Sequence, residues 1–426
     1  MSIYLQNATY IDWKTLKFGL KNIKVSSGDT GGIKFLDSIP PVISDYDTFI
    51  DCKGRFVTKS FACGHHHIYS ALALGMPPPP EIPDNFQNIL KYIWWQIDKN
   101  LDAEMIKYSA LVTGIELVKN GVTFVIDHHS SSEAIEDSLY IIAKALDEIG
   151  ISHLLCYELS DRDGNETLEK GLEETENYLK TGKQGLVGLH ASFTVGNKLL
   201  KDSVSIAEKY NSGIHVHTAE DNIDGKVTLE NYDKKIINRF SDAGVLNFGK
   251  TILAHCIHID NKEREILENS PAHIAQNAES NLNNNVGFFT SEGLNEKNIF
   301  YGTDGIHNDM IRTAKFAYLY GKTKENITAE SVYLRLRNVH NYLSANDFKG
   351  DDDNNLIILN YSPSTEMNEN NFINHFIYGI ESKHINSVIA KGKLIMNNGK
   401  VLNVDEKKIK EHSRKLSGKL WNKLYK

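Results

Sequence analysis

The stretch "RFVTKSFACGHHH" (residues 55–67) decides the fold, because a short apolar run ends there in three consecutive histidines. Further short apolar runs follow, separated by helical segments such as residues 102–121, where an apolar stripe ends just before Gly121. Eight strand–helix units predict a parallel sheet closed into a (β/α)8 TIM-like barrel rather than an open doubly wound sheet. The later strands are predicted within residues 121–129, 151–160, 185–193, 213–220, 251–259, 271–280 and 297–305.

Both ends of the chain differ from this middle part and read as short strands separated by turns. We predict strands within residues 2–12, 22–29, 48–57, 354–361, 374–380 and 385–402, the last range forming a hairpin around "NNGK". The economical interpretation is a small composite β-sandwich domain built from residues 1–59 and 354–426, which includes a C-terminal helix. Residues 60–353 then form the barrel.

Composition excludes several classes of partner and location. The net charge of -8 predicts no strongly basic surface for nucleic acid or an anionic membrane. Neither a signal peptide nor an apolar run of about 20 residues is found in the sequence. The four cysteines are scattered without a C-x-x-C pair, so we expect a reducing, cytoplasmic location.

Polar residues that end the predicted strands indicate a metal site. In a parallel barrel these ends converge on one mouth, which collects His65, His67, His217, His255 and Asp304. Residues two apart on a strand point the same way, so the first two histidines can bind one cation while the histidine between them points away. Several imidazoles and a carboxylate match the ligands of one catalytic divalent ion, for which zinc, iron and manganese all qualify.

Glu220 lies three residues after His217, where the strand passes into a loop. A carboxylate there can deprotonate a nucleophilic water and protonate a leaving nitrogen, as hydrolysis of a C–N bond requires. His255 is interpreted either as a further metal ligand or as a second proton-handling group.

These motifs, taken in order, resemble the amidohydrolase superfamily in its cytosine deaminase, chlorohydrolase and adenosylhomocysteine deaminase-like branch. Residues 70–98, 359–367 and 374–382 look most like the SsnA-type aminohydrolases, and the resemblance spans essentially the whole chain. The motifs are "FACGHHHIYS", "GVTFVIDHHSS", "GLHASFTVG", "GIHVHTAE", "ILAHCIHID", "NAESNLNNNVG" and "YGTDGIHNDM".

The resemblance implies a barrel with a β-sandwich and one zinc or iron ion held by His65, His67, His217 and Asp304. In that branch the glutamate matching Glu220 protonates a ring nitrogen. The residues matching His255 and Asp304 handle the water, a metal-bound hydroxide attacks the ring carbon, and ammonia or another group leaves. Relatives are often dimers, which suggests a homodimer.

The end of the fourth strand separates two branches of the family. The branch with two metals carries a bridging lysine there, whereas this chain has His190, which favours one metal and a substrate contact. Further candidate substrate-binding residues are His129, His307 and Trp94. Lys59-Ser60 and "NAESN" depart from the usual turn residues of the family, which affects local geometry more than the ligands.

We therefore predict a metal-dependent aminohydrolase, a deaminase of a small nitrogen heterocycle that is related to a purine. The alternatives are a ring-opening hydrolase of cyclic amides and a non-catalytic binding homologue.

Overall fold

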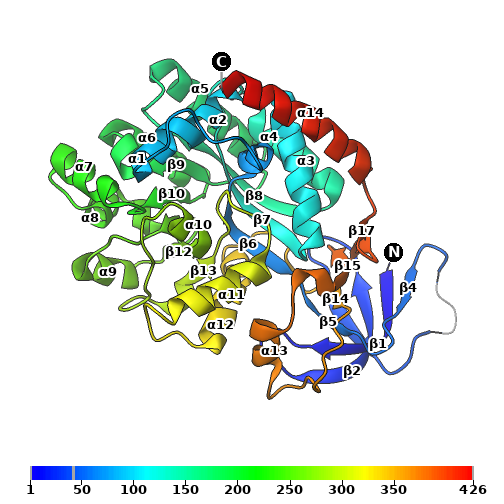
Figure 1. Ribbon diagram of the computed structural model, residues 1–426. Coiled ribbons are helices and arrows are strands. Elements are labelled where there is room, and N and C mark those ends of the chain that lie inside the picture. The colour runs from blue at the N-terminus through cyan, green and yellow to red at the C-terminus, as the bar shows by residue number, and fades with distance from the viewer. Residues whose placement is uncertain (1, 41–43, 425–426) are drawn as a thin grey trace.

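The barrel consists of eight parallel strands in sequence order. A computed structural model describes residues 2–40 and 44–424 of the chain (Figure 1). Every predicted barrel strand is observed within its predicted range, which confirms the predicted barrel. The strands are β6 (Phe61–His66), β7 (Val122–His129), β8 (Ser152–Leu159), β9 (Val187–Ala191), β10 (Ile214–Thr218), β11 (Ile252–His255), β12 (His273–Gln276) and β13 (Ile299–Tyr301).

The first and last strands meet through a parallel bridge between His66 and Asp304. The backbone N–H of Asp304 also donates to the carbonyl of His65 at 3.1 Å. The barrel closure thus carries the last predicted ligand to the first two.

Helices surround the strands and cover their outer faces (Figure 1). The predicted helix over residues 102–121 is α3, which begins after its N-cap Asp102 and is followed by Gly121 at φ +73°. The barrel helices are α3 (Ala103–Lys119), α4 (Ser138–Ile149), α5 (Asn165–Lys180), α6 (Asn197–Lys209), α7 (Asn222–Tyr232), α8 (Ile236–Ala243), α9 (Asn261–Glu268), α10 (Ala278–Asn283), α11 (Met310–Gly321) and α12 (Ala329–Ala345). No helix in the described part of the chain could span a membrane.

An insertion between β6 and α3 contains four short helical segments. The 3-10 helix η1 (Ile68–Ala73) comes first, and α1 (Phe86–Ile89), the π-helical turn η2 (Leu90–Trp94) and α2 (Trp95–Asn100) then run together. A π-helical turn inside a helix is frequently found at a functional site.

The second unit is one nine-stranded sheet, built from both ends of the chain (Figure 1). β5 pairs with β1 in parallel and with β14 in antiparallel register, where Lys59 lies opposite Leu356. This sheet confirms the composite β unit. Its strands are β1 (Ser2–Ile11), β2 (Phe18–Ser26), β3 (Ile33–Leu36), β4 (Thr48–Asp51), β5 (Phe56–Lys59), β14 (Leu356–Leu359), β15 (Ile385–Ala390), β16 (Lys393–Asn397) and β17 (Lys400–Val401).

The predicted hairpin around "NNGK" is present between β16 and β17. Asn397 pairs with Lys400, and the two turn residues, Asn398 and Gly399, have φ of +48° and +75°. Asn-Gly is favoured there because both positions need a left-handed backbone.

The strand predicted at residues 374–380 is wrong, because most of this range belongs to helix α13 (Phe372–Tyr378). Its buried residues Phe372, Ile373, Phe376 and Ile377 recur at helical rather than alternating spacing. The two phenylalanine rings pack edge-on against Tyr333, so tertiary packing favours the helix.

The C-terminal helix α14 (Glu406–Leu424) lies along barrel helix α3, as Figure 1 shows. Trp421 Nε1 donates to the carbonyl of Leu72 at 2.9 Å, and Lys410 pairs with Glu116 at 2.9 Å. Although its residues follow the β unit in sequence, α14 packs on the barrel. The division at residues 59–60 and 353–354 stays a prediction, and residues 1, 41–43, 425 and 426 lie outside the described structure.

A buried cation joins the two units where the chain passes from β5 to β6. Lys59 Nζ donates to the carbonyls of Asp351 and Asp352 at 2.6 and 3.0 Å and lies 3.5 Å from the Asp351 carboxylate. That carboxylate also pairs with His340 Nδ1 at 2.7 Å. The Lys59 ammonium therefore links the end of β5 to residues 351 and 352, which follow the last barrel helix.

We expect Lys59→Met to lower the free energy of unfolding by about 3 kcal/mol, because it leaves a buried carboxylate without its cation. Urea denaturation of both proteins measures this loss. The matched control is Lys170→Met, which breaks an exposed pair with Glu166 (2.7 Å) and should leave the free energy of unfolding nearly unchanged, because water screens the two charges. Equal effects of the two substitutions would contradict a stabilising role for the buried pair.

Candidate metal centre and pocket

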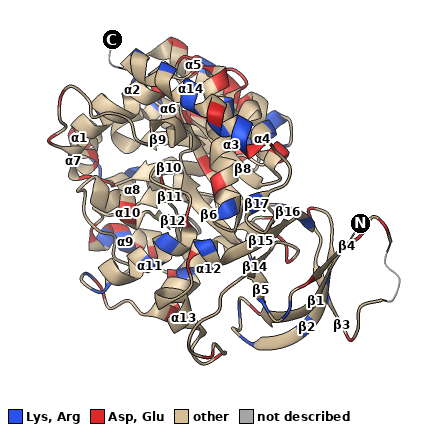
Figure 2. Cartoon of the chain, turned by 45° about the vertical axis from the view of Figure 1, so that its right-hand side comes forward, with Lys and Arg blue, Asp and Glu red and all other residues tan. Residues whose placement is uncertain are grey.

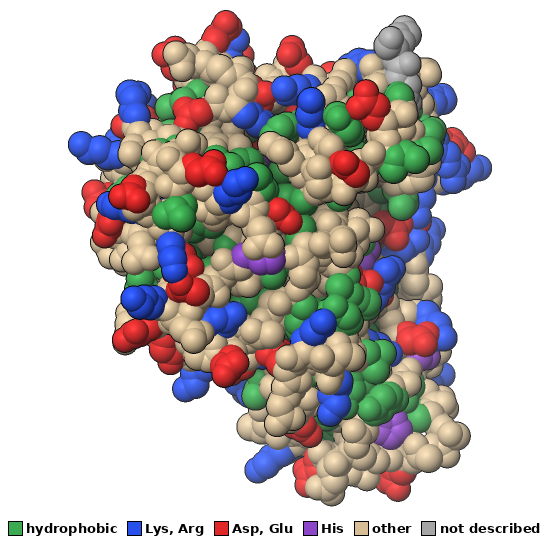
Figure 3. Space-filling model, turned by 60° about the vertical axis from the view of Figure 1, so that its left-hand side comes forward, with side chains coloured by type: hydrophobic (Ala, Val, Ile, Leu, Met, Phe, Trp, Pro, Cys, Tyr) green, Lys and Arg blue, Asp and Glu red, His purple; other side chains and the backbone are tan. Residues whose placement is uncertain are grey.

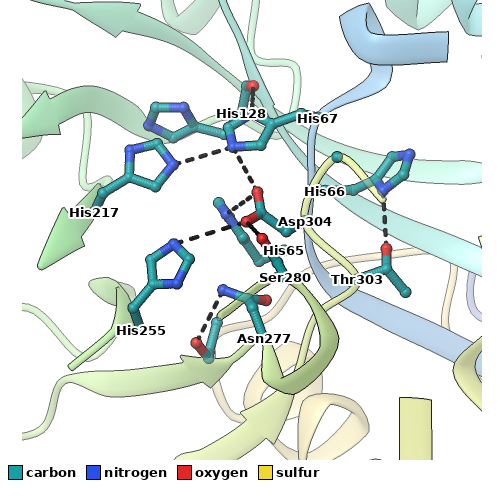
Figure 4. A network of polar contacts seen from close by, with 12 residues as sticks. His65, His66, His67, His128, His217, His255, Asn277, Ser280, Thr303 and Asp304 are labelled. Carbon is teal, nitrogen blue, oxygen red and sulfur yellow. Dashed lines mark hydrogen bonds and ion pairs between the residues drawn. The ribbon is translucent and has the colours of Figure 1, made fainter. Parts of the chain in front are cut away.

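The predicted ligands come together at the carboxyl ends of the barrel strands (Figure 4). His65 and His67 come from the end of β6, His217 from β10 and Asp304 from the loop after β13. All four are buried, and one ligand atom from each lies within 4.8 Å of the others. This arrangement could hold a single metal ion.

Hydrogen bonds fix which nitrogen of each imidazole faces this site. His67 Nδ1 donates to the carbonyl of His128 at 2.6 Å, and His217 Nδ1 donates to the carbonyl of His190 at 2.8 Å. In the neutral rings, each Nε2 then carries a lone pair, and these two nitrogens face each other at 3.1 Å. Two facing lone pairs repel unless a cation or a proton lies between them, so the donor set fits a metal ion.

Asp304 completes the donor set with a carboxylate. Its Oδ1 lies 3.0 Å from His67 Nε2 and 3.5 Å from His65 Nε2, and Ser280 Oγ donates to its Oδ2 at 2.6 Å. Burial alone would lower the pKa of His67, but the Asp304 carboxylate outweighs burial and raises it to about 9. The site therefore favours a positive charge.

His66 points away from the ligands, as predicted, and its Nδ1 lies 2.9 Å from Thr303 Oγ1 (Figure 4). His215, which sequence reasoning missed, lies two residues before His217 and contacts His65 Nδ1 through Nε2 at 2.9 Å. The signal was available, because residues two apart on a strand share a face.

Glu220 and His255 lie beside the ligand set. Glu220 Oε2 is 3.5 Å from His255 Nε2, and Asn284 Nδ2 donates to Glu220 Oε1 at 3.4 Å. Burial raises the pKa of Glu220 to about 7, although His255 opposes this shift. A carboxyl group with this pKa can both give and take a proton near neutral pH.

His255 lies outside the four-residue donor set and forms a second cluster with Glu220 and Asp304. Its Nδ1 is 2.7 Å from Asn281 Oδ1, an oxygen that can only accept, so Nδ1 donates. Its Nε2 faces the Asp304 carboxylate at 4.0 Å. This position suits a group that handles a proton.

Three residues of the site have left-handed backbones: Ala219, His255 and Asp304, with φ of +49°, +77° and +55°. The Asp224 carboxylate accepts the N–H of Ala219 at 2.9 Å and so holds the turn that precedes Glu220. Residues other than glycine adopt this conformation at a cost, which is often found at functional sites.

A pocket with about 500 Å³ of empty volume, part of it open to solvent, lies over the ligands. The apolar part of its lining comes largely from the insertion after β6, and the rest of the lining is largely polar. The lining residues are His67, Tyr69, Phe86, Leu90, Trp94, Trp95, Glu158, Arg162, His190, His217, Glu220, Ser280, Asn284, Asp304 and Gly305.

The predicted substrate-binding residues divide into two pairs. His190 and Trp94 line the pocket, whereas His129 and His307 are not among its lining residues. His129 Nε2 instead contacts Ser131 Oγ at 2.9 Å, and His307 forms an ion pair with Glu279. The substrate-binding role of His129 and His307 stays a prediction.

Sequence reasoning missed Glu158, Arg162 and Trp95, which belong to the polar and apolar parts of this lining. Glu158 lies near the end of β8, so the rule that selected the histidines could have found it. Lys and Arg positions alternate with Asp and Glu positions along the helices (Figure 2), and side chains of both signs are interspersed on the face shown in the space-filling view (Figure 3).

A parallel eight-stranded barrel with a buried histidine–aspartate cluster at the carboxyl ends of its strands is typical of metal-dependent barrel enzymes. Residues 56–346 match the model of the amidohydrolase family, and the chain belongs to that family. The predicted family and enzyme class, a hydrolase of carbon–nitrogen bonds, are confirmed. The finer likeness to the SsnA type stays a prediction.

Curated relatives match along most of their length. The chain is 28% identical to a 5'-deoxyadenosine deaminase of Methanococcus aeolicus, covering 88% of this chain and 89% of that protein. It is 24% identical to a 5-methylthioadenosine/S-adenosylhomocysteine deaminase of Caldanaerobacter subterraneus, covering 96% of each. Among solved structures, an adenosine deaminase from Xanthomonas campestris with bound zinc matches with a TM-score of 0.81 and 15% identity over 98% of both chains, a likeness that shows the fold.

We expect His67→Ala to weaken divalent metal binding by at least about tenfold, since loss of even an outer contact costs that much. Elemental analysis after dialysis against a chelator measures metal per chain. The matched control, His66→Gln, changes the neighbouring histidine that points away and should retain the ion. Full metal retention by His67→Ala would contradict the predicted ligand set.

Proposed function

We propose that this protein is a metal-dependent aminohydrolase that removes an amino group from a purine-like heterocycle. One observation carries the proposal: three members of a buried donor set for a divalent ion, His67, His217 and Asp304, line the same pocket as Glu220, whose pKa is about 7. The two curated relatives are named as deaminases of adenosine derivatives, which supports this reaction and substrate class.

His65, His67, His217 and Asp304 would hold the ion in this proposal. When bound, it would polarise a water molecule and lower the pKa of that water. Zinc is our first candidate because the solved adenosine deaminase contains it, while iron and manganese also suit histidine and carboxylate ligands.

The apolar part of the pocket lining would bind the flat face of the heterocycle. Phe86, Trp94 and Trp95 belong to this part and come from the insertion after β6. Aromatic side chains stack on a ring and exclude water from the reacting atoms. His190, in the polar part of the lining, is our candidate for a polar contact to the ring.

Glu220, His255 and Asp304 would move the protons of the reaction. Glu220 would donate a proton to the ring nitrogen, which makes the neighbouring ring carbon more electrophilic. His255 Nε2 and the Asp304 carboxylate face each other at 4.0 Å and would take up the proton of the attacking water. The proton held by His255 and Asp304 would pass to the leaving amine, which departs as ammonia, and the proton of the remaining hydroxyl would return to Glu220 as the ring carbonyl forms.

The ring-opening alternative is less well supported. None of the described residues that line the pocket is a lysine, and His190 ends β9 where a metal-bridging lysine would lie. A non-catalytic homologue is also less well supported, because the donor set and Glu220 are both in place.

Two further proposals concern location and assembly. All four cysteines are buried and free, which supports a reducing cytoplasmic location. The homodimer rests on the resemblance to the family alone.

We expect the zinc-loaded protein to release ammonia from at least one member of a panel of aminopurines, adenosine derivatives, pterins, aminopyrimidines and triazines. A coupled ammonia assay with a chelator-treated control measures this release. A ring-opened product without ammonia would instead establish the cyclic amide alternative. If neither ammonia nor a ring-opened product is formed, the deaminase proposal loses its support.

We expect Glu220→Gln to lower kcat by about 10²- to 10⁴-fold, the usual contribution of a general acid, without loss of the metal. The protonated form donates, so kcat/KM of the wild type should fall as pH rises above about 7, the pKa of Glu220. Glu220→Gln should lack this decline. Glu208→Gln, at an exposed position of α6, is the matched control. An unchanged pH profile in Glu220→Gln would contradict the assignment.

A further inference from the structure

Glu158 is a second buried carboxylate in the pocket, and the proposed proton transfers do not use it. It lies in β8, and its side chain is 4% exposed. His128 Nδ1 and Arg162 Nη1 each approach its carboxylate to 3.4 Å. The His128 ring in turn packs against His217, with ring centroids 4.6 Å apart. Glu158 and Glu220 therefore flank the metal ligands through different contacts.

The two carboxyl groups differ in charge. Burial acts to raise the pKa of Glu158, but His190, His128 and Arg162 outweigh it and hold that pKa well below its usual range. Glu158 is thus an anion, whereas Glu220 titrates near neutral pH. A buried anion costs free energy unless hydrogen-bond donors reach it.

Arg162 and His128, the two neighbours of Glu158, direct most of their N–H donors to other acceptors. Arg162 Nε donates to Asp163 at 2.9 Å, and Arg162 also pairs with Asp98 and lies over the Trp95 ring at 5.2 Å. His128 Nε2 is directed at the carbonyls of Leu189 and His215, at 3.1 and 3.2 Å.

Both contacts to Glu158 are therefore longer than the about 2.8 Å of a strong charge-assisted hydrogen bond. A carboxylate offers about four lone-pair positions, so Glu158 retains acceptor capacity on the pocket side.

We propose that Glu158 determines specificity, accepting hydrogen bonds from N–H or O–H donors of a substrate bound in this pocket. This inference rests on the proposed deaminase function. Two sources share this donor chemistry: a ring N–H or amino group, and the hydroxyl groups of an attached sugar. His190 and Trp95, whose rings lie 6.0 Å apart, line the same pocket.

The test compares the zinc-loaded wild type with Glu158→Gln on matched pairs of compounds. Adenine and 2,6-diaminopurine differ in the 2-amino group, a donor attached to the ring, and 2',3'-dideoxyadenosine and adenosine differ in sugar hydroxyls. We expect Glu158→Gln to lower kcat/KM by about 10- to 100-fold for the donor-bearing member of one pair, the usual weight of a hydrogen bond to a charged group. The donor-lacking member should change less than about threefold. The affected pair identifies the source of the donor.

Asp163→Asn is the matched control, because Asp163 contacts the same arginine but does not line this pocket. It should leave both members of each pair within about twofold of the wild type. Metal content is measured on all variants, since Glu158 also lies near His128 and His217 in a cluster that could hold an ion. Loss of the zinc in Glu158→Gln would make Glu158 a metal ligand and overturn the proposal.

The outcomes separate this inference from the deaminase proposal. Ammonia release with equal losses for both members of each pair would overturn the role of Glu158 alone. Without ammonia from any compound the deaminase proposal fails, and dissociation constants from calorimetry then replace kcat/KM for the same pairs. The wild type alone also tests the role of Glu158, so the test stands even if Glu158→Gln does not fold. If the wild type binds none of the compounds, or does not prefer the donor-bearing ones, the role of Glu158 is overturned.

Discussion

The site depends on one kind of hydrogen bond, from the Nδ1 of a ligand imidazole to a carbonyl at the end of the neighbouring strand. His67, directly after β6, donates to the carbonyl of His128 on β7, and His217 on β10 donates to that of His190 on β9. The register of adjacent strands thus fixes the tautomer and orientation of each ring. A register shift of one residue would turn a ligand to the other face of the sheet. The register of the barrel strands therefore also determines how well the ligand rings can bind a metal ion.

Residues with a left-handed backbone turn the chain at the ends of the barrel strands, next to the ligands. Ala219, His255 and Asp304 each adopt a conformation that costs about 1–2 kcal/mol outside glycine. Local hydrogen bonds offset this cost, including the bonds from the N–H of Ala219 to Asp224 and from the N–H of Asp304 to the carbonyl of His65. Sharp turns hold the functional side chains at the barrel mouth, where longer loops would let them spread.

The sequence was sufficient for the barrel and for the grouping of His65, His67, His217 and Asp304, because parallel strands bring their carboxyl ends together whatever the loops do. It was insufficient for Asn281 and Asn284, which approach His255 and Glu220 from α10 and its C-cap, where only tertiary packing sets the distance. The helix at residues 372–378 was missed for a related reason, since a short apolar run suits either structure until its packing partners are known.

The position of β5 has a consequence for synthesis of the chain. This strand lies between β1 and β14, so its pairing with residues 356–359 waits until the whole barrel has left the ribosome. Contacts of such long sequence separation form slowly, and an unpaired strand edge is prone to aggregation in the meantime. The N-terminal strands therefore depend on rapid barrel folding or on a chaperone to protect that edge until the last part of the chain arrives.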